Sequence, residues 1–104
     1  YEFSLRYLFP PVINDGKMVD IFMRAAEKTV GHGKVITERY SSMAGDDFAY
    51  FANMVPSVYF RLGIANEGID AVYPIHSSKF KIDENALKIG YKTMVQTALE
   101  FLKS

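Results

Sequence analysis

This chain of 104 residues contains two histidines, and one of them occupies a position from which it could bind a ligand. His76 lies within residues 73–80, between an apolar run at 58–62 and a long amphipathic stretch at 83–103. We predict a strand for the run and a helix for the stretch, so His76 falls on a loop beyond the carboxyl end of a strand. Ligands of open α/β sheets bind in the crevice outside these ends. Neutral imidazole is a common metal ligand, although a solvated histidine is the plainer interpretation.

A second candidate site is the acidic pair Asp46 and Asp47, which follows Gly45 and precedes an apolar segment that begins at Phe48. The helix macrodipole favours acidic side chains in a first turn, so the pair could simply cap a short helix. The functional alternative is a turn that lines a cleft and places one carboxylate near a metal ion or a substrate amine. The residues alone leave both interpretations open.

The other histidine, His32, lies between Gly31 and Gly33 and is followed by Lys34. A phosphate-binding loop needs four residues between its glycines and a Ser or Thr after the lysine, and this segment has neither. We therefore predict a solvent-exposed turn here and no role for His32 in binding.

Three strands and three helices are expected to position these residues. Residues 1–8 alternate apolar and polar side chains, which is typical of a half-buried strand, and Pro10-Pro11 ends that pattern. We predict further strands at 35–38 and 58–62, and helices that begin after Asn14, Asp47 and Asp83. The order strand-helix-strand-helix-strand-helix predicts an α/β fold, part of a mostly parallel sheet covered by helices.

Apolar spacing also predicts which helix faces are buried. Gly31 is expected to end the first helix and Pro56 the second. In the strand at 58–62, alternate residues should point to opposite faces, with Arg61 on the more polar one. The last helix carries one apolar stripe that we expect to face the core, formed by Leu87, Tyr91, Met94, Ala98, Leu99 and Leu102.

Composition limits the classes of partner. Twelve Lys and Arg balance twelve Asp and Glu, and no basic run is present, so nucleic acid is not an expected partner. The absence of cysteine excludes disulfides and thiolate metal sites. No apolar run approaches the 18 residues or so that a membrane-spanning helix needs. We therefore expect a soluble, cytoplasmic protein that does not bind membranes.

Three motifs together resemble a known enzyme family. They are residues 43–51 (MAGDDFAYF), residues 55–63 (VPSVYFRLG) and residues 75–80 (IHSSKF). In order and spacing they resemble the C-terminal end of the metallo-amidohydrolases, a family of aminoacylases, N-acyl-amino-acid and hippurate hydrolases, auxin-conjugate hydrolases and zinc carboxypeptidases. The similarity runs from Pro10 nearly to the end of the chain.

This resemblance implies a two-domain enzyme that cleaves small N-acyl amino acids or peptides with metal-activated water. Residues 1–8 would be the final strand of an inserted lid and dimerisation domain, and residues 9–104 the C-terminal part of the catalytic α/β domain. The partners would be the rest of a parent chain and a second copy, in a homodimer formed through the lid. The divalent metal would be zinc, or manganese or cobalt.

Residue by residue, His76 matches the last metal-binding histidine of the family. Gly45, Asp46 and Asp47 match residues that line its active site, although the family more often has Glu where this chain has Asp46. The resemblance places the remaining ligands and the general base outside these residues, so we expect no catalytic residue here and no activity from the chain alone. One alternative is a stand-alone, non-catalytic α/β binding or interaction module, and another is a structural fragment that dimerises through an exposed edge.

Overall fold

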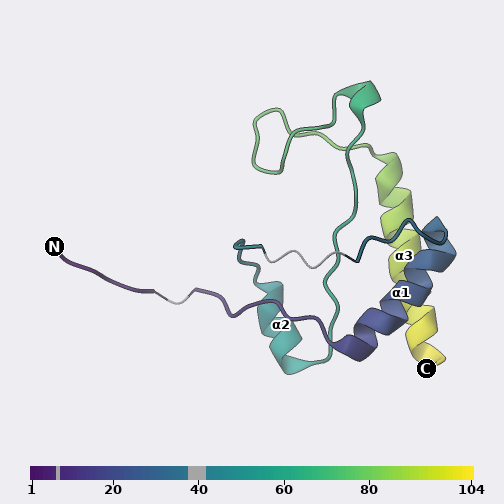
Figure 1. Ribbon diagram of the computed structural model, residues 1–104, viewed down its shortest axis with the longest axis horizontal. Helices are drawn as coiled ribbons and strands as arrows, with labels where there is room; N and C mark the ends of the chain where they lie inside the picture. The colour runs from purple at the N-terminus through teal and green to yellow at the C-terminus, as the bar shows by residue number, and fades with distance from the viewer. Residues whose placement is uncertain (7, 38–41) are drawn as a thin grey trace.

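The computed structural model describes residues 1–6, 8–37 and 42–104 (Figure 1). Its helices are α1 (Gly16–Val30), α2 (Phe48–Met54) and α3 (Asn85–Leu102), with a short 3₁₀ turn, η1 (Glu67–Ile69). Helices α1 and α3 pack against each other, whereas α2 is joined to them through extended segments. Residues 1–6 run away from the helices as an extended arm.

The start of α1 is set by Asp15, one residue later than predicted. The Asp15 carboxylate accepts a hydrogen bond from the Met18 backbone N–H at 2.9 Å, which satisfies a donor of the first turn. Asn14 has a different task, because its side-chain amide exchanges two hydrogen bonds with the backbone of Tyr59, at 2.9 and 2.7 Å. Gly31 ends the helix with a φ of 94°, as predicted.

Small residues make up most of the buried positions of α1 and α3, which pack against each other. The buried residues of α1 are Ile21, Phe22, Ala25 and Ala26, and those of α3 are Ala86, Gly90, Thr93 and Glu100. Lys28 of α1 donates to the Glu100 carboxylate at 2.7 Å, and Gln96 donates to the same oxygen at 2.8 Å. The ion pair and the close helix contact together hold the two helices in register.

The buried face of α3 is not the one predicted from its apolar stripe. Leu87, Tyr91, Met94 and Leu102 are 54%, 57%, 63% and 78% exposed, and Ala98 and Leu99 are exposed as well. The adjacent face is buried because its residues are small: a methyl group added at Gly90 would lie 2.9 Å from Leu62 Cδ2. Periodicity identified a face suited to burial, but no described element covers it.

The predicted parallel sheet is wrong for the described residues. Residues 58–62 are extended, and their side chains alternate as predicted, with Val58, Phe60 and Leu62 half-buried and Tyr59 and Arg61 exposed. Phe60 packs on Phe22 of α1 with ring centroids 4.5 Å apart. No ladder partner lies beside this segment in the described structure, and the bridge found there is an isolated antiparallel one between Asn66 and Ala71. Without a neighbouring strand, the backbone has no ladder of hydrogen bonds.

The other two predicted strands are also unpaired. Residues 1–6 and Leu8 are exposed and form no strand, and the same holds for residues 35–37 except that Val35 is half-buried. Tyr7 and Glu38, which belonged to these predicted strands, lie outside the described residues.

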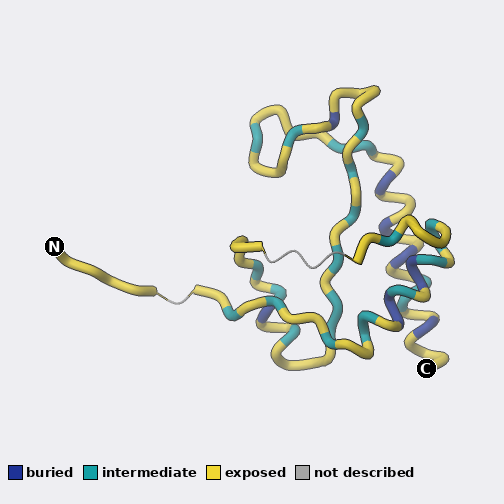
Figure 2. The backbone as a smooth tube through the Cα atoms, in the orientation of Figure 1, coloured by how far each residue is buried: buried dark blue, intermediate teal, exposed yellow. Residues whose placement is uncertain are grey.

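Much of the apolar surface remains uncovered (Figure 2). The Cα radius of gyration is 16.5 Å, whereas a compact domain of this length has about 13 Å. None of the helices in the described structure has the length and apolar character needed to cross a membrane.

Candidate functional site

His76 lies at a tight turn in the loop between η1 and α3. The Ser77 N–H donates to the Pro74 carbonyl at 3.2 Å, which makes His76 the third residue of a β-turn. Its φ is 70°, as a type II turn requires at this position, where glycine or asparagine is the usual residue. The side chain is exposed, and none of the hydrogen bonds found among the described residues involves its ring.

The base of this loop is closed by Asn66 and Asp83. The Asn66 side-chain amide donates to Asp83 Oδ2 at 2.7 Å, and the Asp83 N–H donates to the Ile64 carbonyl at 3.0 Å. The other oxygen, Asp83 Oδ1, accepts the Asn85 N–H at 3.0 Å at the start of α3. The hydrogen bond from Asn66, followed by that from Asn85, lowers the pKa of Asp83. The N-cap of α3 is Glu84, one residue later than the predicted Asp83, although the Asp83 carboxylate does accept a hydrogen bond from the first helical residue.

Asp46 and Asp47 differ in how their side chains are held. Asp46 Oδ1 accepts the Phe48 N–H at 2.8 Å, and Asp46 Oδ2 accepts the Tyr59 hydroxyl at 3.0 Å. This hydrogen bond raises the pKa of Tyr59 because the carboxylate favours the protonated hydroxyl. Asp47 is exposed and its side chain makes no capping hydrogen bond to α2. The structure therefore fixes one carboxylate of the pair and leaves the other in solvent.

Gly45 lies directly before this pair, against an aromatic ring. A methyl group added at Gly45 would lie 2.9 Å from Phe9 Cδ2. Phe9 in turn packs edge-on against Tyr50, whose hydroxyl donates to the Leu8 carbonyl at 2.9 Å. The small residue thus lets the segment before α2 lie close to the N-terminal segment.

The structure does not bring His76 and the acidic pair together. The loop that carries His76 and the start of α2 lie well apart in Figure 1. Within residues 1–6, 8–37 and 42–104, no three His, Asp or Glu side chains are grouped so that they could hold a metal ion. The described residues do not fit a complete metal site by themselves, since structural and catalytic zinc sites take at least three protein ligands.

Three residues of these surroundings escaped the sequence analysis: Tyr59, Asn66 and Asp83 in its role at the loop base. Tyr59 was placed only within the predicted strand at 58–62, and Asn66 was given no role. The available signal was weak: asparagine and aspartate at the two ends of a long loop are common capping residues. Their pairing depends on the path of the loop, which the sequence does not specify.

His32 lies in an exposed turn after α1, as predicted. Its side chain is 92% exposed, and Nδ1 lies 3.2 Å from a carboxylate oxygen of Glu27. His32 is therefore a suitable control for His76.

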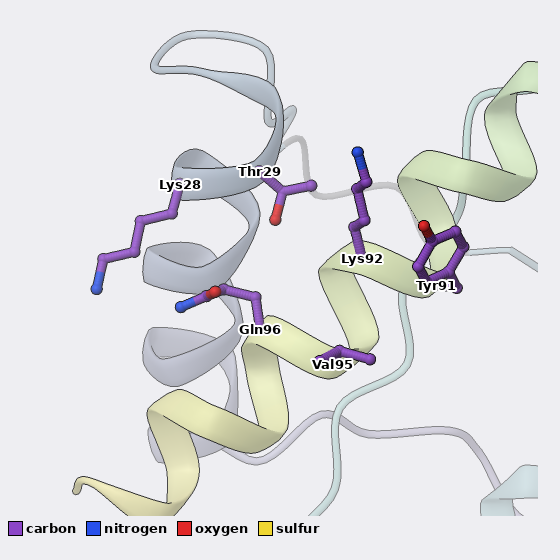
Figure 3. A pocket seen from close by; sticks show the side chains of 6 residues that line it. All are labelled: Lys28, Thr29, Tyr91, Lys92, Val95 and Gln96. Carbon is purple, nitrogen blue, oxygen red and sulfur yellow. The ribbon is translucent and has the colours of Figure 1, made fainter.

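The open groove between α1 and α3 holds none of the candidate site residues (Figure 3). Its volume is about 410 Å³, and it is lined by Lys28, Thr29, Tyr91, Lys92, Val95 and Gln96. A second hollow of about 500 Å³ separates the start of α1 from the end of α2. The candidate residues instead lie on loops and at a helix start, as functional residues often do.

Comparison with known proteins identifies the family. Residues 1–100 match peptidase family M20/M25/M40, and this chain belongs to that family. It is 32% identical over 94 residues to thermostable carboxypeptidase 2 of Saccharolobus solfataricus, covering 90% of this chain and 23% of that protein. It is 31% identical over 101 residues to the putative amidohydrolase YhaA of Bacillus subtilis, covering 97% and 25%.

A plant protein is also similar to this chain. The chain is 26% identical over 95 residues to IAA-amino acid hydrolase ILR1-like 6 of Arabidopsis thaliana, covering 91% of this chain and 20% of that protein. The chain therefore spans about a quarter or less of the length of these curated relatives. No solved structure matches it. The prediction of a metallo-amidohydrolase family from the three motifs is confirmed at the level of the family.

Proposed function

We propose that this chain is the C-terminal part of the catalytic domain of a metal-dependent amidohydrolase. The complete enzyme would hydrolyse the amide bond of N-acyl amino acids or small peptides. Membership of the M20/M25/M40 family supports hydrolase chemistry. The names of the relatives, a carboxypeptidase, an amidohydrolase and an IAA-amino acid hydrolase, support an amide next to an amino acid as the bond that is cleaved.

The observation that carries this proposal is the backbone of His76. A non-glycine residue in the left-handed region costs about 1–2 kcal/mol relative to the right-handed one. The turn would form more easily with glycine, and the exposed ring adds no packing that offsets the cost. Strained residues of this kind cluster at functional sites, so the imidazole at position 76 is better explained by ligand binding than by folding.

His76 would supply one ligand to a divalent metal ion, which is zinc, or manganese or cobalt. The remaining ligands and the general base would come from other parts of the complete protein, because the described residues contain no group of three or more His, Asp or Glu side chains that could hold the ion. A bound divalent ion supplies Lewis acidity and activates water for hydrolysis. Within this chain, the turn at residues 74–77 presents the imidazole, and the Asp46 carboxylate is held rigidly for a polar substrate group.

The exposed surfaces fit the same proposal. The apolar stripe of α3 would pack against the rest of the catalytic domain. Residues 1–8 would return from a lid domain through which two copies of the enzyme form a dimer. A stand-alone, non-catalytic module would have to keep these surfaces in water.

The experiment compares the complete protein with residues 1–104 alone. We expect the complete protein to hydrolyse N-acetyl amino acids, to lose this activity on chelation, and to recover it with zinc or manganese. The isolated chain should be inactive under the same conditions. Turnover by the isolated chain near the ~10 s⁻¹ of a typical enzyme would contradict the proposal. A metal-loaded complete protein without any hydrolysis would favour the binding module.

A further inference from the structure

We propose that residues 1–6, the extended arm, pair with the same residues of a second copy as an antiparallel ribbon centred on Ser4. The inference gives residues and a register to the dimer named above. It rests on the arm itself and needs neither a metal ion nor the hydrolytic activity.

The arm has free backbone groups and uncovered apolar side chains. None of the hydrogen bonds within the described backbone involves residues 1–6, and the arm runs away from the helices (Figure 1). Phe3 and Leu5 are 77% and 64% exposed. Among the described residues, neither Glu2 nor Arg6 forms an ion pair. An extended segment with unpaired N–H and C=O groups is a template for pairing with another chain.

The arm has one apolar and one polar face. Alternation places Tyr1, Phe3 and Leu5 on one face and Glu2, Ser4 and Arg6 on the other. Residues directly opposite each other in an antiparallel pair lie on the same face of the ribbon. A slip by one residue would therefore mix the two faces, and only registers that oppose apolar with apolar residues keep them separate.

One of these registers also pairs the charges. When Ser4 faces Ser4 of the second copy, Phe3 faces Leu5 and Glu2 faces Arg6. A two-fold axis through this point makes each pair occur twice. Centring the ribbon on Phe3 would instead oppose Glu2 to Ser4, and a parallel ribbon in register would oppose Glu2 to Glu2. Opposite charges that face each other stabilise a strand pair, whereas like charges destabilise it.

The symmetry of this pattern favours a second copy as the partner. Glu2 and Arg6 lie at equal distances in sequence from Ser4, which a contact with an unrelated strand would not require. A ribbon of two strands is marginally stable on its own. We therefore expect the arm to strengthen and align a dimer to which other residues of the complete protein contribute.

Charge exchange tests the register. Glu2→Arg would oppose arginine to arginine in both cross-strand pairs, and Arg6→Glu would oppose glutamate to glutamate. A mixture of the two variants would form ribbons in which one copy supplies both arginines and the other both glutamates. Asp20→Arg, at an exposed position of α1, makes the same change in charge outside the arm and is the control.

The measurement is the dimer dissociation constant of the complete protein, from analytical ultracentrifugation of a dilution series. Glu2→Arg and Arg6→Glu should each weaken the homodimer about tenfold, since two cross-strand pairs change from attraction to repulsion. The mixed variants should form heterodimers with about the affinity of the unchanged protein. Asp20→Arg should leave the dissociation constant unchanged.

Recovery in the mixture supports the ribbon, because two misfolded variants would not restore each other. Unchanged homodimers in both single variants, or a mixture that associates no more tightly than they do, would overturn it. A lower melting temperature with an unchanged dissociation constant would also overturn it, since the arm would then pair within its own chain. Hydrolysis of N-acetyl amino acids is measured separately, so the proposed function and the ribbon can fail independently.

Discussion

At the scale of single residues, His76 combines an exposed ring with a backbone conformation that glycine adopts more easily. We expect His76→Gly to be more stable than His76→Ala by about 0.5–1 kcal/mol, because glycine relieves the left-handed strain while losing more chain entropy. Both variants lack the imidazole, so the comparison isolates the backbone. Chemical denaturation of the two variants measures the difference. Equal stabilities would show that the turn is not strained.

Tyr59 and Asp46 provide a second test at this scale. The hydrogen bond to Asp46 raises the pKa of Tyr59 above its ordinary value of about 10. A group whose pKa is raised on folding contributes stability that is present below its unfolded pKa and lost as the pH rises through its folded pKa. Stability should therefore fall above about pH 10.

Asp46→Asn should return the Tyr59 pKa toward its ordinary value and remove this alkaline loss. Ultraviolet titration of the tyrosines, with Tyr59→Phe to assign the signal, measures both. Asp47→Asn is the matched control, because the Tyr59 hydroxyl bonds to Asp46. A Tyr59 pKa that shifts equally with Asp47→Asn would contradict the assigned geometry.

The residue types of the site were predictable, but their contacts were not. Asp46 as a helix-start acid and His76 as a loop histidine follow from short-range sequence signals. The sequence did not distinguish Asp46 from Asp47, since that difference is made by Tyr59, thirteen positions away. The exchange between Asn14 and Tyr59 is equally non-local and displaced the predicted cap of α1 by one residue.

At the scale of elements, the helices were predictable and the strands were not. Helix hydrogen bonds connect residues four apart, so a helix end such as Gly31 is visible in the sequence, and the start of α3 could be placed to within one residue of its N-cap, Glu84. A strand depends on a partner that is distant in sequence. Residues 58–62 carry the alternation of a strand, and Phe60 and Leu62 do point toward α1 and α3, yet the described residues provide no neighbouring strand.

The contact between α1 and α3 yields a prediction for acid conditions. Lys28, Gln96 and then Lys103 lower the pKa of Glu100, with the hydrogen bond from Lys28 as the largest cause. A lowered pKa contributes stability that is present above the unfolded value, near 4.5, and is lost as the pH falls through the folded value. Stability should therefore decline below about pH 4.5 in part through this pair.

Lys28→Met should reduce that decline, because it removes the largest cause while keeping the length of the side chain. Lys92→Met, on the exposed side of α3, is the control. Unfolding midpoints between about pH 2 and 6 provide the measurement. An unchanged pH dependence in Lys28→Met would show that the ion pair does not couple the helices.

At the scale of the whole molecule, we propose that other parts of the complete protein cover the exposed apolar stripe of α3. A substitution within the stripe tests this. Met94 is 63% exposed, so Met94→Ala should change the stability of the isolated chain by less than about 0.5 kcal/mol. In the complete protein the same change should cost about 2–5 kcal/mol if the residue is buried there. Ile21→Ala, at a residue 1% exposed, should be costly in both.

Thermal or chemical unfolding measures the free energy of unfolding of the isolated chain and of the complete protein, with each substitution made separately. If Met94→Ala is as mild in the complete protein as in the isolated chain, the stripe is not a contact surface within the enzyme.

The most direct test of the whole account is the zinc affinity of the complete protein with and without the His76 imidazole. His76→Gly removes the ligand and also relieves the turn, so a loss of metal cannot be attributed to a destabilised loop. We predict a loss of affinity of at least about a hundredfold, since even residues that only orient a ligand cost 10–100-fold. His32→Gly, in the exposed turn after α1, should retain full affinity. Unchanged zinc affinity in His76→Gly, or a loss in His32→Gly instead, would contradict the assignment of His76 as a metal ligand.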